Sequence, residues 1–320
     1  MFKQHPRYLL AVWLTLLFLL PLPLVHLLFR VLSGQTPRQL LLIAAGVVAY
    51  TWWLAAIFLA TRPAWVDRLI GLPEMYQIHA GLGFGAIVLA FLHFQNLVSM
   101  DARVRLTGDW AFYLAVFGLL YASLFLSGIL VDRLPLAARL KSRLQHVFQH
   151  TLSVWIHRLN LVVVGLIWLH VHLIPLINQQ FSFMALFDLL TLAVFGAYAH
   201  QKLGLAVNRS IGILRQVHQL TPRVTQLTVQ VPNLQRPLKP GDFLFLAFPH
   251  HTQIDTDAHP VSVTAYDPVT AEISLTIGVV GDWTRQVSQL APGASVTLTG
   301  PFGQLASLVA RKHGPLIGAC

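Results

Sequence analysis

The sequence predicts an α-helical membrane bundle of six transmembrane helices followed by a small antiparallel β-barrel. The chain is 55% hydrophobic and only 11% charged, whereas a soluble globular domain carries about 25% charged residues. Its apolar residues are concentrated before about residue 203, in runs long enough to cross a bilayer. From about Gly204 onward, short alternating runs punctuated by Pro and Gly replace them. This change of pattern predicts a membrane part and a soluble part.

Six stretches meet the requirement of about 20 mostly apolar residues for a transmembrane helix. They are residues 8–29, 40–60, 76–98, 110–131, 152–177 and 182–203. Lys and Arg gather at the N-terminus, in the second and fourth connections and after the last span. Because cytoplasmic loops carry the excess of positive charge, both termini are predicted to be cytoplasmic, in a protein of the plasma or inner membrane.

The composition argues against several other classes of protein. The single cysteine, Cys320, excludes a disulfide framework and a Cys-rich zinc or iron–sulfur site. The formal net charge is +10, but the basic residues flank apolar runs, where anionic lipid headgroups are the ordinary partners. Membrane lipid is therefore the predicted partner, and nucleic acid is not.

Two of the predicted spans carry paired histidines. His79 and His93 lie 14 residues apart in the third span, and His157 and His170 lie 13 apart in the fifth. Fourteen residues make almost four turns, so the first two share one face about 21 Å apart along the helix axis. Ionisable residues inside a bilayer are costly and usually functional. Two levels of paired imidazoles predict the axial ligands of two haem irons, and the haems are of b type because no C-x-x-C-H occurs.

The outer ligand of the fifth span remains open on geometry alone. On an ideal helix a spacing of 13 leaves His157 and His170 about 140° apart, whereas His172 lies about 60° off. Regular geometry therefore favours His172, and His170 requires a local bulge in the helix. The third span also carries glycines, which fit either a flat ring lying close to the backbone or ordinary helix packing. These are Gly81, Gly83 and Gly85.

After Gly204, six short runs alternate polar and apolar residues. The runs are 214–217, 225–231, 243–248, 261–265, 273–279 and 295–298. Turn residues separate them, such as Lys239–Asp242 and Tyr266–Pro268. Six short strands at this spacing predict a small antiparallel barrel.

Three motifs in this segment resemble those of the NADPH oxidase and ferric reductase superfamily. His259-Pro260-Val261-Ser262 looks like the first flavin motif of that superfamily, residues 277–284 look like the second, and residues 300–303 look like the motif that closes its barrel. Their order and their attachment to a six-span, four-histidine domain carry the resemblance over nearly the whole chain. The oxidases also share the histidine spacings, and this favours His170 over His172.

The resemblance implies a domain organisation. Residues 1–203 are expected to form a ferric reductase-like transmembrane domain with two b haems, and residues 204–303 an FAD-binding barrel. Residues 304–320 resemble the stub of a nicotinamide-binding domain, since residues 315–320 look like its first strand. We expect the chain to be a fragment of a longer protein. The alternative is that a separate reductase binds NAD(P)H and supplies the hydride.

The resemblance also implies roles for individual residues. The Ser262 hydroxyl is expected to approach the reactive edge of the isoalloxazine. The other expected flavin-site residues are His259, Pro260, Val261, Thr264, Gly281 and Thr284, with Thr284 and nearby backbone N–H groups binding the pyrophosphate. Two positions depart from the family. Val261 replaces an aromatic residue and removes stacking surface, and Gly278 replaces a basic residue and removes a phosphate partner.

The implied function is transfer of electrons from NAD(P)H through flavin and two haems to an external acceptor, either dioxygen, giving superoxide, or ferric iron. Superoxide-forming oxidases place a His and an Arg at the outer haem pocket. The corresponding candidates here are Leu97, which lacks the imidazole, and Arg38, for which a helix-end role is the commoner interpretation. One alternative is a haem-containing membrane subunit that relies on a separate reductase and passes electrons to a partner protein. A second is a non-redox transporter, although no internal repeat supports it.

Overall fold

The structure is a computed structural model that describes residues 6–32, 34–126, 135–136, 139, 143, 150–203, 209–234, 236–239, 241–251, 254 and 258–303. The predicted stub at residues 304–320 lies outside the described residues. Two compact units make up the chain. The helical unit comprises residues 7–61 and 76–198, and the barrel unit comprises residues 1–6, 62–75 and 199–320.

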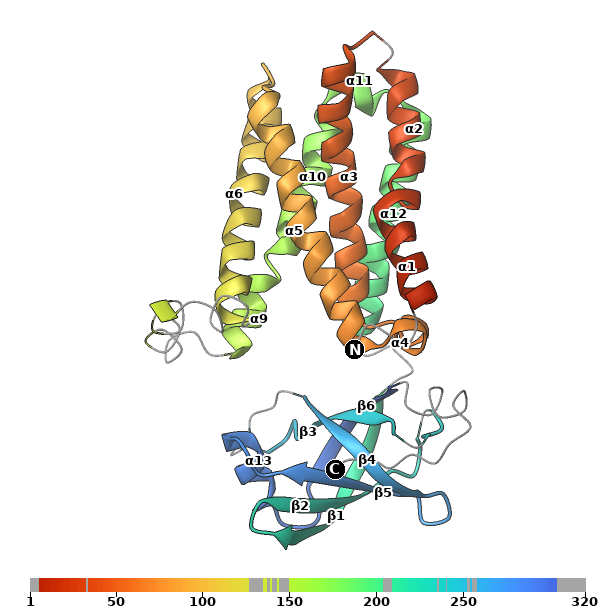
Figure 1. Ribbon diagram of the computed structural model, residues 1–320, viewed down its shortest axis with the longest axis vertical. Helices are drawn as coiled ribbons and strands as arrows, with labels where there is room; N and C mark the ends of the chain where they lie inside the picture. The colour runs from red at the N-terminus through yellow and green to blue at the C-terminus, as the bar shows by residue number, and fades with distance from the viewer. Residues whose placement is uncertain are drawn as a thin grey trace. The chain divides into compact units, whose positions relative to one another are not determined.

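Among the described residues, six stretches of helix are long and apolar enough to cross a membrane: Arg7–Val31, Pro37–Ala60, Leu72–Asn96, Ala102–Phe125, Leu152–His172 and Phe181–Lys202 (Figure 1). Their elements are α1 (Pro6–Leu14), a π-helical turn (Thr15–Leu19), α2 (Leu22–Val31), α3 (Pro37–Ala60), α5 (Leu72–Asn96), α6 (Ala102–Phe125), α9 (His150–His157), α10 (Asn160–His172) and α12 (Phe181–Lys202). The described connections also contain the short helices α4 (Ala64–Ile70) and α11 (Pro175–Asn178). The six predicted spans are confirmed.

Side-chain caps start two of the helices that begin earlier than their apolar runs indicate. At the start of α3, the Thr36 hydroxyl accepts from the Gln39 N–H at 3.3 Å, and the Gln39 side chain accepts from the Thr36 N–H at 3.1 Å. At the start of α6, the Asp101 carboxylate accepts from the Arg103 N–H at 2.8 Å. These caps provide acceptors for N–H groups that have no partner within the helix. Each helix therefore begins with a polar first turn, before its apolar run.

The core of the helical unit lies where α10 packs against α6 and α3. Tyr50 is almost fully buried there, with its ring 4.6 Å from that of Phe187 and its hydroxyl 2.7 Å from that of Thr191. The outward faces are apolar as well, and Leu41 and Leu192 remain 67% and 70% exposed. Contiguous exposed apolar surface of this kind marks contact with a membrane or a partner.

The barrel closes in the strand order β1-β2-β5-β4-β3-β6, with every pair antiparallel. Its elements are β1 (Arg209–Thr221), β2 (Val224–Gln230), β3 (Phe243–Ala247), β4 (His259–Asp267), β5 (Glu272–Gly278), the short helix α13 (Asp282–Val287) and β6 (Ser295–Phe302) (Figure 1). Alternate residues such as Leu227, Val229 and Leu275 fill the core. Six apolar helices followed by a closed six-stranded antiparallel barrel confirm the predicted fold class.

Helix α4 belongs to the same compact unit as the barrel. Its Asp67 is 1% exposed, and one carboxylate oxygen accepts from the Gly303 N–H at 3.1 Å. Burial raises the pKa of Asp67 above its ordinary value, although the N–H groups of Gly303 and Leu72 and the charge of Arg68 oppose the shift. Folding of the barrel unit therefore favours the neutral, protonated form of the Asp67 carboxyl group.

Asp67→Asn is expected to stabilise the barrel unit at pH 7, because the amide has no charged form to bury. Folding raises the pKa of this carboxyl above its value in the unfolded chain, 3.8. The contribution of the carboxyl to the stability of the folded state is therefore complete below that pH and is lost as pH rises through the folded pKa. The variant keeps an acceptor oxygen but cannot ionise. Hydrogen exchange of β6 between pH 4 and 8 measures the effect.

Asp267→Asn is the matched control for this measurement. The Val269 N–H and the Thr270 hydroxyl lower the pKa of Asp267, so its contribution is present above the unfolded pKa and is lost as pH falls. The control should therefore weaken protection at pH 7. If hydrogen exchange showed weaker protection of β6 in Asp67→Asn than in the unchanged chain at every pH, this prediction would be wrong. The hydrogen bonds to the ionised carboxylate would then stabilise the fold by more than the burial of its charge destabilises it.

Candidate functional site

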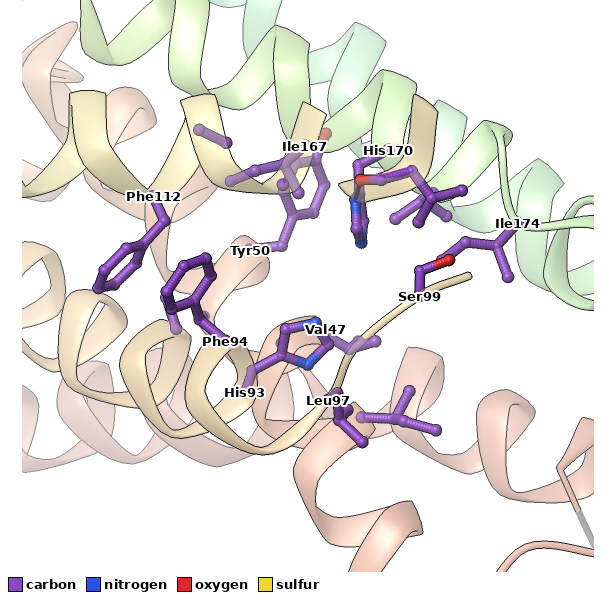
Figure 2. Close-up of a pocket in the computed structure, with 18 of the residues that line it drawn as sticks. Val47, Tyr50, His93, Phe94, Leu97, Ser99, Phe112, Ile167, His170 and Ile174 are labelled. Atoms are coloured by element: carbon purple, nitrogen blue, oxygen red, sulfur yellow. Dashed lines mark hydrogen bonds between the residues drawn. The ribbon is translucent and has the colours of Figure 1, made fainter. Parts of the chain in front are cut away.

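The four predicted histidines meet as two pairs within the helical unit. The ring centroids of His79 and His157 lie 5.8 Å apart, with an angle of 62° between the ring planes. Those of His93 and His170 lie 6.4 Å apart at 75°. Helix α5 carries the first member of both pairs, and α9 and α10 carry the partners. Figure 2 shows His93 and His170 projecting from opposite walls into one space.

The separation of the rings fits an iron held between two imidazoles. A ligating imidazole nitrogen lies about 2 Å from its metal and the ring centre about 1 Å behind it, so two opposed rings have centroids about 6 Å apart. Two protein ligands per level also suit haem, because the porphyrin supplies the remaining donors. Within the described part of the chain, no group of three or more His, Cys, Asp or Glu is placed to hold a bare metal ion.

Backbone carbonyls of neighbouring helices orient the imidazoles. Nδ1 lies within hydrogen-bonding distance of a carbonyl in three of the four rings: His79 and Ala56 at 2.9 Å, His93 and Leu42 at 3.0 Å, His170 and Val104 at 2.9 Å. A ring that donates its Nδ1 proton in this way keeps Nε2 unprotonated and able to bind iron. Nδ1 of His157 is buried and has no hydrogen-bond partner among the described residues.

A tightened break in the fifth span brings His170 into position. Between α9 and α10 the N–H groups of Leu159, Leu161 and Val162 bond to carbonyls three residues back, at 2.9–3.0 Å. Such turns advance about 120° per residue instead of 100°, and this supplies part of the rotation that a spacing of 13 lacks. The expectation of a bulge is therefore wrong in kind, because the helix is overwound and not widened. The Asn160 side chain donates to the His157 carbonyl at 2.8 Å across the break.

His172 points to a different partner. Its Nε2 lies 3.4 Å from the Asp188 carboxylate of α12, and its Nδ1 lies 2.8 Å from the Trp168 carbonyl. The Trp168 ring lies against it, with centroids 3.9 Å apart. The structure thus pairs His170, and not His172, with His93.

Two glycines outside the third span make room for the outer imidazoles. A Cβ atom at Gly46 of α3 would lie 2.8 Å from Nδ1 of His93, closer than real contacts allow. A Cβ atom at Gly108 of α6 would lie 3.1 Å from the ring of His170. Sequence reasoning missed both residues, because periodicity along one span does not show which neighbouring span faces it.

The glycines of the third span have another role. A Cβ atom at Gly81 would meet Trp13, and one at Gly85 would meet Trp52, each at 2.8 Å. Gly83 has nothing within 4 Å. Close packing of helices accounts for the first two, so the structure supports the packing interpretation for Gly81 and Gly85.

A cavity of about 400 Å³ surrounds the outer histidine pair, within the range typical of ligand pockets. Its walls are mainly apolar: Val47, Tyr50, Phe94, Phe112, Ile167 and Ile174, which Figure 2 labels, together with Ile43 and Trp53. Polar side chains also line it: Gln95, Ser99, Arg105 and Asp109. An apolar space with a few polar groups suits a flat macrocycle that carries charged substituents.

Arg38 is not the cation of this cavity. Its guanidinium is exposed and donates to the Asn96 side chain at 3.1 Å, outside the cavity lining. Arg105, in the first turn of α6, lines the cavity instead, together with Leu97. The sequence placed the start of this span after Arg105 and so assigned that residue to a connection.

In the barrel unit, strand β4 presents only some of the predicted flavin residues. Pro260, Ser262 and Thr264 are exposed on its outer face. Val261 is 5% exposed and belongs to the barrel core, because successive side chains of a strand point to opposite sides. Its side chain therefore does not line an outer flavin site, which corrects that part of the prediction.

His259 lies beside an indole that lacks a hydrogen-bond acceptor. Its ring stacks on Trp283 of α13, with centroids 4.1 Å apart and 27° between the planes. Trp283 is 8% exposed, and its Nε1 is buried with no partner among the described residues. A buried donor without an acceptor requires an explanation, and a bound ligand rich in acceptors, such as a flavin, would provide one.

Thr284 is occupied in capping α13. Its hydroxyl lies 3.0 Å from the Val280 N–H and 2.9 Å from the Gly281 N–H, both of which donate to it. It also donates to the Gly281 carbonyl at 2.8 Å. These groups satisfy one another, so a pyrophosphate here would need other donors than the Thr284 hydroxyl and these two N–H groups.

No protein-family model matches the sequence, and no curated protein matches it either. Among solved structures, similarity is found to a siderophore-interacting protein of Acinetobacter baumannii, with 14% identity over 29% of this chain and 39% of that chain and a TM-score of 0.26. A siderophore-interacting protein of Aeromonas hydrophila matches with 15% identity over 30% of this chain and 44% of that chain, also with a TM-score of 0.26. A flavohemoglobin from Malassezia yamatoensis with bound FAD and heme matches at 13% identity over 93% of this chain and 64% of that one, with a TM-score of 0.28. The chain thus spans less than half of the two siderophore-interacting proteins. Similarities this weak support no conclusion about its cofactors or activity.

Proposed function

We propose that this chain is a membrane oxidoreductase that passes electrons from a flavin on the barrel through two b haems to an external acceptor. The observation that carries the proposal is the pair of facing imidazoles at two levels of one apolar bundle, with ring centroids 5.8 and 6.4 Å apart. Packing alone does not require two such pairs, because intramembrane ionisable residues are costly.

Each pair of histidines has a separate role in this proposal. His79 and His157 would hold the inner iron, and His93 and His170 the outer iron. Haem, when bound, supplies a one-electron centre, and FAD supplies the conversion of a hydride into single electrons. Carbonyls behind the imidazoles hold their orientation and raise their basicity. On the barrel, the exposed Ser262 hydroxyl offers a hydrogen bond to the reactive edge of the flavin.

The donor is NAD(P)H, bound by a further domain or by a partner reductase. In this proposal membrane lipid surrounds the helical unit, and the positive charge of its connections favours a cytoplasmic location for both termini. Electrons then leave the cytoplasmic side and reach the opposite face.

The residues of the outer cavity favour ferric iron over dioxygen as the acceptor. The resemblance to the oxidases implies a His and an Arg from the second span at this place. Leu97 lines the cavity where the His would stand, and Arg38 bonds to Asn96 instead of facing it. Arg105 offers a cation at the cavity that suits a negatively charged ferric chelate.

Purification of the full chain in detergent, followed by pyridine haemochromogen and flavin quantification, tests the proposal. Two b haems and one FAD per chain are expected. After reduction with dithionite, the haems should be reoxidised by a ferric chelate under argon faster than air forms superoxide. Folded protein without haem would refute the proposal and leave transport as the explanation of the histidines.

The engaged Thr284 and the inward Val261 reduce the flavin contacts that the barrel offers. These two residues favour a second candidate function. In it, the chain is a haem subunit that receives electrons from a separate reductase and passes them to a partner protein. Two haems without FAD in the same experiment would support this candidate.

A further inference from the structure

Strand β3 carries an aromatic cluster that faces away from the barrel core. The rings of Phe243, Phe245 and Phe302 have centroids 5.5–5.9 Å apart. The residue between the two phenylalanines of β3, Leu244, lies in the core, so alternation along the strand turns the phenylalanines outward. The proposed electron path assigns no role to this cluster.

Only one edge of the cluster is accessible. Phe245 and Phe302 are 7% and 3% exposed, and the Arg62 guanidinium lies 4.5 Å above the Phe245 ring. Phe243 is only partly buried. The two covered rings therefore support Phe243 from behind and fix its orientation.

Phe243 lies beside the residue expected at the reactive edge of the flavin. In the antiparallel pairing of β3 with β4, it stands directly opposite Ser262. Residues directly opposite each other share a face of the sheet, with Cβ atoms about 4.5–5.5 Å apart. The strands thus present a phenyl ring and an exposed hydroxyl next to each other on the outer surface.

We propose that Phe243 supplies the aromatic surface on which the isoalloxazine ring of the flavin stacks. The inference rests on the proposed flavin site. Position 261, which is aromatic in the family motif, points into the core, so it offers no ring to the outer face of β4, whereas the neighbouring strand β3 does. A flat, electron-poor ring system packs well against a phenyl face. Because neighbouring rings already hold Phe243 in place, its side chain loses little conformational entropy when the flavin stacks on it.

Flavin affinity of the full chain in detergent, measured by equilibrium dialysis, tests the inference. Phe243→Leu, which keeps the apolar volume but removes the ring, should raise the Kd for FAD about tenfold or more, the range found for aromatic stacking of bases. It should also shift the absorption bands of the bound flavin towards those of free flavin. Phe243→Tyr keeps the ring and should bind FAD as the unchanged chain does. The haem content of each variant reports that the helical unit is folded, and hydrogen exchange of β6 reports the same of the barrel unit.

Two results would overturn the inference while leaving the proposed function intact. One is a Phe243→Leu variant that binds FAD with unchanged affinity and spectrum. The other is equal loss in the Leu and Tyr variants, which would indicate a role in packing. If the unchanged chain takes up haem but no FAD, the proposed flavin site itself is wrong, and the inference is wrong with it.

Discussion

His93→Ala is expected to lower the haem content from two b haems per chain to one. The imidazole of His93 faces His170 at 6.4 Å, and Leu42 fixes the orientation of its ring, so the variant removes one of only two protein ligands at the outer level. The inner pair lies about 21 Å away along α5 and should be unaffected. Pyridine haemochromogen spectra with protein quantification measure the ratio, and electron transfer to the acceptor should fall at least a hundredfold because the path is interrupted.

His172→Ala is the matched control. This residue lies two positions from His170 at the end of the same helix, but it contacts Asp188 and Trp168. The control should keep both haems. Loss of one haem in His172→Ala, with two retained in His170→Ala, would show that the ideal-helix expectation was right and the observed pairing wrong.

Gly46→Ala and Gly108→Ala are each expected to displace the outer haem without removing any ligand. A Cβ atom at Gly46 would lie 2.8 Å from Nδ1 of His93, and one at Gly108 would lie 3.1 Å from the ring of His170. The imidazole of His93 must move in Gly46→Ala, and that of His170 must shift by a few tenths of an ångström in Gly108→Ala. Each shift weakens the hydrogen bond to a backbone carbonyl and turns the imidazole away from the proposed iron position. Second-shell changes at metal sites typically cost 10–100-fold in affinity, and we expect Gly46→Ala at the upper end because its contact is shorter.

Gly83→Ala is the control for these variants. Nothing lies within 4 Å of a Cβ atom at this position, and alanine is the better helix former by about 1 kcal/mol. Haem affinity should therefore be unchanged, and stability should not fall. Titration of haem-depleted protein with haemin separates affinity from folding. Equal haem loss in all three variants would indicate a general intolerance of alanine in these helices.

Much of the fold follows from the sequence because the bilayer and the barrel each impose one simple rule. Apolar length identified every span, and alternation identified every strand. The errors occur at helix ends, where polar first turns such as Ala102–Asp109 belong to a span but interrupt its apolar run. The buried position of Val261 was also predictable, since a residue next to an exposed Ser262 on a strand must point inward.

The site was less predictable for a different reason. The four histidines stand out because imidazoles are rare inside membranes, but the choice of His170 depended on a resemblance. The overwound break between α9 and α10 carries no simple sequence signal. The contacts of Gly46 and Gly108, and the replacement of Arg38 by Arg105 at the cavity, depend on which helices are neighbours. A single sequence does not contain that information in any periodic form.

The two histidines of α5 share one continuous helix, whereas their partners sit on two segments joined at Arg158–Leu159. The continuous helix α5 thus sets the spacing of one member of each histidine pair, and the break between α9 and α10 separates the other two. For the two proposed haems, the separation along α5 is then fixed and does not depend on how either partner ring adjusts. The break would let each histidine pair settle on its own haem independently. Mutation could then tune one proposed redox centre while its distance from the other stays the same.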